Sequence, residues 1–368
     1  MKVPYFDLKA QYAAMREEIL GALDRVCQNA AFILGEEVAQ FEKEFAAYCE
    51  VKHCVALNSG TSALHVALLA AGIGAGDEII TTPNTFIATA EAISYTGAKP
   101  VFVDIEPATA NIDPRLIAQA ITPRTKAILP VHLYGRPAAM DAILDVAARQ
   151  RLAVIEDACQ AHSARYRGKR VGGFGLAAAF SFYPTKNLGG YGEGGALTTN
   201  DERVAQLARS LRDHGAVRRY THDRVGYNYR MDGFQGAVLR IKLKQLDVWT
   251  AKRQDLARQY RKHLANVRID LPHDDPHDEC VYHLFAVYVD NRDAVRAELE
   301  ARGVQTAIHY PSPLALQKAY ANLGYRPGSL PQVERVCERV LCLPMFPELT
   351  LEQAEYAAKT LAEIVGPK

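Results

Sequence analysis

The chain has 368 residues, a formal net charge of +1 and 49% hydrophobic residues. A near-neutral chain without a long run of lysine or arginine does not suit a polyanionic partner such as nucleic acid. No stretch approaches the roughly 20 apolar residues of a membrane-spanning helix, so we expect no membrane span.

The length favours two domains, and the apolar fraction is large enough for an extensive core. The seven cysteines are an odd number without a CxxC pair, which indicates reduced thiols rather than disulfides or a zinc site. Residues 1–12 lack the apolar run of a signal peptide. We therefore expect a cytoplasmic protein without a structural metal.

Helix and strand patterns alternate along the first two-thirds of the chain. The spacing of Val38, Phe41, Phe45 and Tyr48 predicts a helix over 35–49. The next predicted elements are strands over 53–58, 76–83, 99–105, 126–135, 152–160 and 177–182, and helices over 62–73, 86–97 and 140–151. Apolar strands that alternate with helices predict an α/β fold whose mostly parallel sheet is covered on both faces.

The pattern changes in the last third. A long helical stretch is expected from about 231 to 264. It is followed by a strand over 280–290, a helix over 292–303, a strand over 304–313 and a helix over 349–365. This order is typical of a smaller α+β domain. We place the boundary so that residues 1–245 form a large domain and residues 246–368 a small one.

Ligands of open parallel sheets bind beyond the carboxyl ends of the strands, so the segments after successive strands should open toward one crevice. One of them, NSGTSAL (58–64), leads from a strand into a helix through Gly60 and Thr61. Free N–H groups and the helix dipole favour a phosphate there. A capped helix without a ligand would need the same residues, so both interpretations stay open.

Two carboxylates end the strand in VIEDACQAH (154–162), Glu156 and Asp157. A helix cap is one interpretation. The other is a fixed negative charge beside a ring nitrogen, as pyridoxal phosphate requires, because that cofactor accepts electrons only while its pyridine nitrogen stays protonated. Gln160 lies one helical turn further along the chain, where it could donate to the ring hydroxyl.

Lys186 stands between an apolar strand and a string of glycines in SFYPTKNLGGYGEGGAL (181–197). A surface lysine is the simplest interpretation. A pocketed lysine fits the neighbours better, and burial lowers the pKa of a lysine by up to about 3–5 units. The neutral amine then forms a Schiff base with an aldehyde, and the glycines leave space for it. Ser181, on the preceding strand, could reach a phosphate.

Together these segments resemble the sugar aminotransferases of the DegT/DnrJ/EryC1/StrS family, which are fold-type-I pyridoxal-phosphate enzymes. The resemblance rests on six motifs in the family's order, and a further one, AIHYPSPLALQKAY, extends it over nearly the whole chain. The motifs are NSGTSAL, TFIATAEA, VIEDACQAH, SFYPTKNLGGYGEGG, LRDHG and YNYRMDGFQGAVL. The family implies a large domain with a mostly parallel sheet and a smaller C-terminal α+β domain.

The resemblance implies a role for each matching residue. Lys186 would hold the cofactor as a Schiff base and move protons during the reaction. Asp157 would bind the pyridine nitrogen and Gln160 the ring hydroxyl, while Phe86 stacks on the ring. Phosphate contacts would come from Gly60, Thr61 and Ser181, and from Asn228 of a partner subunit, so that a homodimer shares its sites. Substrate contacts are expected from Tyr183, His214, His309 and Tyr310.

The implied reaction moves an amino group from L-glutamate to a ketone on a nucleotide-linked deoxysugar, through the pyridoxamine form of the cofactor. The segment 130–143 favours C3 of a dTDP-linked 3-keto-6-deoxyhexose. C4 of a dTDP-, UDP- or GDP-linked 4-keto sugar remains an alternative. Dehydratase members carry histidine where Lys186 stands, which favours amino transfer.

Two other classes of protein are alternatives to a sugar aminotransferase. A non-catalytic regulator on the same fold would not need Asp157, Gln160 and Lys186 together. A nucleotide-binding oxidoreductase would need a GxGxxG segment after its first strand, and the sequence has none there.

Overall fold

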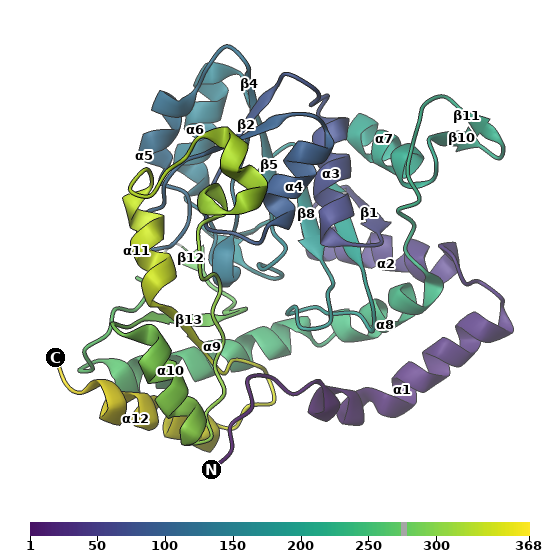
Figure 1. Cartoon of the computed structure of the whole chain (residues 1–368). Coiled ribbons are helices and arrows are strands. Elements are labelled where there is room, and N and C mark those ends of the chain that lie inside the picture. Colours follow the sequence, from purple (N-terminus) through teal and green to yellow (C-terminus); the bar gives the residue numbers. More distant parts are fainter. Residues whose placement is uncertain (274–277) are drawn as a thin grey trace.

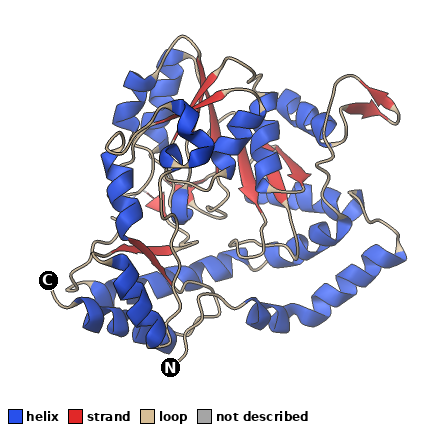
Figure 2. Cartoon of the chain, in the orientation of Figure 1, coloured by secondary structure: helices blue, strands red, loops and turns tan. Residues whose placement is uncertain are grey.

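A seven-stranded sheet forms the centre of the computed structural model, which describes residues 1–273 and 278–368 (Figures 1 and 2). Only β9 runs antiparallel to its neighbours, so the predicted mostly parallel sheet is confirmed. In spatial order the strands are β1 (His53–Leu57), β9 (Gly195–Thr199), β8 (Ala177–Ser181), β5 (Ala153–Asp157), β4 (Thr125–Leu129), β2 (Glu78–Thr81) and β3 (Lys99–Phe102).

Both faces of this sheet are buried because helices cover each side, and successive side chains of a strand point to opposite faces. Val55 and Leu57 of β1 belong to the core under one layer of helices, whereas Cys54 and Ala56 belong to the core under the other. The first layer holds α3 (Gly60–Ala70), α4 (Ala88–Tyr95) and α7 (Glu202–Arg212), and the second holds α2 (Gly35–Tyr48), α5 (Pro114–Ile117), α6 (Met140–Gln150) and α8 (Gly233–Leu243). The expected α/β class is therefore confirmed.

The predicted helix over 231–264 is wrong as one element. It divides at Lys244 and Gln245 into α8 and α9 (Leu246–Leu264). The two halves pack on different partners: α8 lies against α2 and α1 (Leu8–Gln28), whereas α9 lies against α12 (Leu351–Val365). The chain therefore turns between α8 and α9, so that each helix reaches its own packing partners.

Two predicted strands are also shorter or absent. The strand expected over 126–135 ends at Leu129, because Pro130 has no N–H to donate and residues 133–135 form a tight turn. The strand expected over 304–313 is reduced to two isolated bridges, one from Val304 to Val3 and one from Ala307 to Cys342. Pro311 and Pro313 remove two of the donors that a longer ladder would need.

The C-terminal part is built around the antiparallel pair β13 (Phe285–Tyr288) and β14 (Val340–Leu343), with α9, α10 (Arg292–Ala301), α11 (Pro331–Arg339) and α12 beside it. The first residues of the chain also lie here, because Val3 bridges to Val304. The proposed division at residue 245 stays a prediction.

Three smaller features complete the chain. A hairpin of β10 (Ala216–Arg218) and β11 (Thr221–His222) projects from the body at the right of Figure 1. A three-stranded sheet joins β12 (Asp278–Glu279), β6 (Arg165–Tyr166) and β7 (Lys169–Arg170). No helix among the described residues is long and apolar enough to cross a membrane.

Candidate active site

A cavity of about 530 Å³ opens at the carboxyl ends of the parallel strands. The segments that follow β1, β2, β4, β5 and β8 all contribute to its walls, together with residues of the C-terminal part. Every site residue predicted from the sequence lines this cavity except His214 and Asn228: Gly60, Thr61, Phe86, Asp157, Gln160, Ser181, Tyr183, Lys186, His309 and Tyr310.

One end of the cavity is formed by the beginning of α3. Ser59 caps the helix, and its side-chain and backbone oxygens accept the N–H groups of Ser62 and Ala63. The N–H groups of Gly60 and Thr61 have no acceptor among the described residues. A Cβ atom on Gly60 would lie 2.7 Å from Cβ of Ser181, so only glycine lets the helix end approach β8 this closely. The free N–H groups of Gly60 and Thr61, the hydroxyl of Ser181 and the dipole of α3 together form a cradle that suits a phosphate.

Asp157 lies at the end of β5 with an exposed fraction of 4%. Its carboxylate accepts hydrogen bonds from Thr89 Oγ1 at 2.7 Å and from the Cys159 N–H at 3.1 Å. Thr85 in turn bonds Thr89 at 2.7 Å. These contacts hold the carboxylate at one place in the cavity wall, which is what a cationic ring nitrogen needs as a partner.

The neighbouring Glu156 points to the other face of β5, away from the cavity. It accepts N–H groups from Gly172, Phe174 and Gly175 at 2.8–3.0 Å, and it contacts His132 at 3.1 Å. A carboxylate satisfied by four donors is a structural anchor for the loop around 172–175. Strand alternation thus separates two adjacent carboxylates into different environments.

Lys186 stands in the cavity wall, and burial lowers the pKa of its ammonium group, although Cys159 and Asp157 oppose this shift. No hydrogen bond from its Nζ atom to another described residue is present. The glycines that follow let the chain fold back sharply: a Cβ atom on Gly189 would lie 2.2 Å from the carbonyl oxygen of Pro184. The local sequence therefore presents a desolvated amine to the cavity, and the neutral form of such an amine is the one that reacts with aldehydes.

Gln160 is held by two neighbours. Its Oε1 atom accepts the Tyr134 N–H at 2.8 Å, and its Nε2 atom donates to the Tyr310 hydroxyl at 3.3 Å. The Tyr134 hydroxyl donates to the carbonyl of His309. This network links the end of β4 to the segment that carries His309 and Tyr310.

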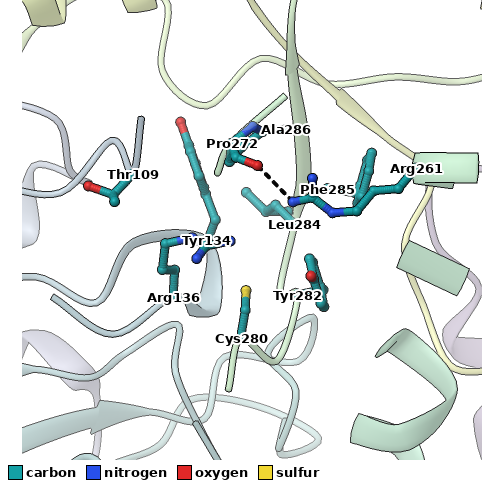
Figure 3. A pocket seen from close by; sticks show the side chains of 10 residues that line it. All are labelled: Thr109, Tyr134, Arg136, Arg261, Pro272, Cys280, Tyr282, Leu284, Phe285 and Ala286. Atoms are coloured by element: carbon teal, nitrogen blue, oxygen red, sulfur yellow. Dashed lines mark hydrogen bonds between the residues drawn. The ribbon is translucent and has the colours of Figure 1, made fainter. Parts of the chain in front are cut away.

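Figure 3 shows a small pocket beside Tyr134 that shares no lining residue with the active-site cavity. Tyr134 and Arg136 face Leu284 and Phe285 there, and Arg261 reaches in to bond the carbonyl of Pro272 at 2.8 Å. The pocket that they enclose has about 20 Å³, which is room for roughly one water molecule. It is therefore packing behind Tyr134 rather than a second ligand site.

Aromatic and imidazole rings line the entrance side. Phe86 has an exposed fraction of 56%, and its ring lies 6.2 Å from that of Tyr310. The His309 ring stacks on Tyr5 at 6.2 Å. Burial, together with the charge of Lys186, lowers the pKa of His309 to about 4, so His309 is neutral at physiological pH.

His214 and Asn228 lie outside the cavity of their own chain. Both are exposed, and they flank the projecting hairpin. The carbonyl of Asn228 accepts a hydrogen bond from Asn58 at 3.3 Å. The prediction for Asn228 concerns the cavity of a partner subunit and stays a prediction.

Three residues of this region were not singled out from the sequence. Thr89 lay inside a quoted motif, but nothing local marked it as the partner of Asp157. His283 lines the cavity and contacts Asn187 at 3.3 Å, and burial lowers the pKa of its ring well below the usual value. Arg253 is buried beside the cavity. Each is brought here by tertiary contacts from a distant part of the chain.

Residues 13–362 match the DegT/DnrJ/EryC1/StrS aminotransferase family. A dTDP-3-amino-3,4,6-trideoxy-alpha-D-glucose transaminase from Streptomyces venezuelae is 48% identical over 354 residues, covering 96% of this chain and 93% of that protein. A "pleiotropic regulatory protein" from Geobacillus stearothermophilus is 47% identical over 366 residues, covering 99% and 98% of the two chains.

Among solved structures, DesV of S. venezuelae in complex with a ketimine intermediate is similar over 100% of this chain and 99% of its own, with 47% identity and a TM-score of 0.98. The chain belongs to the DegT/DnrJ/EryC1/StrS aminotransferase family, and it is a pyridoxal-phosphate-dependent sugar aminotransferase. The predictions of family, fold, enzyme class and cofactor are thereby confirmed.

Proposed function

We propose that this enzyme moves an amino group from L-glutamate to C3 of a dTDP-linked 3-keto-6-deoxyhexose. The observation that carries the proposal is a cavity holding Lys186, Asp157 and the Gly60 cradle in a chain 48% identical to a transaminase named for a 3-amino sugar. The segment 130–143, which resembles C3-specific members, reaches the site through Tyr134, whose N–H donates to Gln160.

In this proposal each part of the cavity takes one part of the cofactor. Gly60, Thr61 and Ser181 hold the phosphate, because their free N–H groups and hydroxyl converge at the helix end. Asp157 holds the ring nitrogen protonated, Gln160 donates to the ring hydroxyl, and Phe86 covers one ring face.

Bound pyridoxal phosphate supplies an electron sink for the electrons released at the reacting carbon. Lys186 supplies the proton transfers. Its amine takes a proton from the glutamate carbon that bears nitrogen and later returns one to the sugar carbon that receives nitrogen. A lowered pKa suits this task, because the same group must accept and donate a proton near neutral pH. Glutamate leaves as 2-oxoglutarate.

The proposal includes a cytoplasmic homodimer with shared sites. Asn228 is exposed on the segment next to the projecting hairpin. In a homodimer it would reach the phosphate in the cavity of the other chain. His214 lies at the base of the same hairpin, and Tyr183, His309 and Tyr310 line the cavity. We assign these four to the sugar nucleotide.

Single half-reactions test the proposal. The enzyme is converted to its pyridoxamine form with glutamate, and dTDP-linked 3-keto and 4-keto 6-deoxyhexoses are then offered separately. We expect the 3-keto sugar alone to restore the cofactor's original absorbance. Restoration by the 4-keto sugar alone would keep amino transfer and overturn the C3 assignment, whereas no response to glutamate would reject the donor.

A further inference from the structure

A second chamber of about 260 Å³ adjoins the active-site cavity. The two share Tyr183, Thr185, Lys186, His283 and His309 as walls. The remaining walls of the chamber come from the N-terminal segment 5–8, from Gln11, from α9, from Leu284 and from residues 345–348. Lys186 therefore stands at the junction, and a molecule whose nitrogen reacts there can extend into either space.

Arg253 of α9 lines this chamber and has an exposed fraction of only 5%. Its Nη1 atom donates to the carbonyls of Tyr282, His283 and Met345 at 3.1, 3.4 and 2.8 Å. The Nε atom is buried without a partner, and Nη2 makes no hydrogen bond to the described residues. The carbonyls fix the guanidinium while its Nε–Nη2 edge, a fork that matches a carboxylate, stays unused.

The charge of Arg253 also lacks a full counter-ion. Burial lowers the pKa of its guanidinium to about 10, so it remains positive at neutral pH. Glu348 attracts it, but no carboxylate of the described residues forms an ion pair with it. Burial raises the pKa of Glu348, although the charge of Arg253 opposes this shift. Asp7 is used by two N–H groups as the cap of α1. A buried cation without a paired carboxylate is costly, and an anionic ligand would offset that cost.

We propose that the free edge of Arg253 binds the α-carboxylate of the amino donor while the donor's nitrogen lies at Lys186. This inference rests on the proposed function, whose donor is an amino acid. The sugar nucleotide also carries anionic groups, but its diphosphate is attached at C1, two ring carbons from a C3 ketone. An α-carboxylate is one bond from the reacting carbon, which suits a chamber that begins at Lys186.

The test compares the two half-reactions in Arg253→Met, which keeps an unbranched apolar stem but removes the fork and the charge. We expect kcat/KM of the glutamate half-reaction to fall by roughly tenfold or more, as for the loss of a charge-assisted bidentate contact. The sugar half-reaction should stay within about twofold of the wild type. Arg258→Met is the matched control, because Arg258 lies on the same helix, is exposed and contacts Asp255.

A binding measurement on the holoenzyme separates this inference from the choice of donor. Glutarate has neither an amine nor a ketone, so it binds without reacting. By calorimetry, the wild type and Arg258→Met should bind it, and Arg253→Met should bind it at least about tenfold more weakly. If glutamate leaves the wild type unchanged, the proposed donor is wrong, yet glutarate binding that depends on Arg253 would still support the carboxylate subsite.

Arg253→Met also removes the contacts of Arg253 with three carbonyls, which destabilises the fold, so one measurement uses the wild type alone. L-glutamate is compared with 4-aminobutyrate, which is the same molecule without its α-carboxylate. A large preference for glutamate supports the inference. Equal kcat/KM for the two amines, or an Arg253→Met enzyme that loses only the sugar half-reaction, would overturn it.

Discussion

The adjacent carboxylates of Glu156 and Asp157 lie on opposite faces of strand β5, in different environments. On one face, Glu156 is satisfied by three N–H groups and a histidine, and it fixes a loop. On the other, Asp157 accepts only two donors and lines the cavity with Lys186. A buried carboxylate is thus a structural group where the protein supplies every partner, and an available one where a partner is left to the ligand.

The sharpest test on the cavity face is Lys186→Ala. We expect turnover to fall below detection and the absorbance of bound cofactor to change, because no other amine lines the cavity among the described residues. Circular dichroism should show an intact fold. Lys244→Ala, on an exposed lysine, is the control and should be fully active. Full activity of Lys186→Ala would reject its role.

Asp157→Asn should have the next largest effect. The amide keeps a partner for Thr89 but removes the negative charge, and breaking a buried charge pair costs about 3–5 kcal/mol, or roughly 10²–10⁴ in rate. The measurement is kcat with saturating cofactor. A variant with wild-type kcat would show that this carboxylate does not face the ring nitrogen.

Gly60→Ala should weaken cofactor binding without abolishing the chemistry. The new Cβ atom would lie 2.7 Å from Ser181, and overpacking of this kind costs about 1–3 kcal/mol, so we expect roughly tenfold weaker affinity. The cofactor dissociation constant is measured by titration of the apoenzyme. Gly74→Ala is the matched control, because a Cβ atom there meets nothing within 4 Å.

Thr89→Val probes the support of Asp157. Loss of one hydrogen bond is worth about 0.5–1.5 kcal/mol, so kcat should fall by roughly two- to tenfold. A loss as large as that of Asp157→Asn would mean that the threonine does more than hold the carboxylate.

Glu156→Gln should have the smallest effect on activity and a clear one on stability. It leaves the N–H groups of the loop with a weaker acceptor, and we expect a loss of about 1–3 kcal/mol in the free energy of unfolding, with kcat almost unchanged. Urea unfolding and steady-state rates are measured together. If kcat falls as it does in Asp157→Asn, the two faces of β5 do not differ as the structure indicates.

Local sequence patterns were sufficient to predict most strands of the sheet and the position of the cavity. Apolar runs such as 177–182 and glycine or proline boundaries are short-range signals, and parallel strands bring their carboxyl ends to one edge. That is why Gly60, Asp157, Ser181 and Lys186, separated along the chain, were expected together and do line one cavity. The sequence alone left Glu156 and Asp157 together at the end of one strand, and the structure showed that they face different sides of it.

The sequence by itself thus determined the fold class, the family and the segments that meet at the strand ends, because periodicity, turn residues and motif order are local properties of the chain. Only the tertiary structure decided that the stretch 231–264 turns between two packing partners, that Thr89 supports Asp157, and that Arg253 is buried beside Lys186. These features depend on which distant segments pack together, and contacts between distant segments leave no periodic signal in a single sequence.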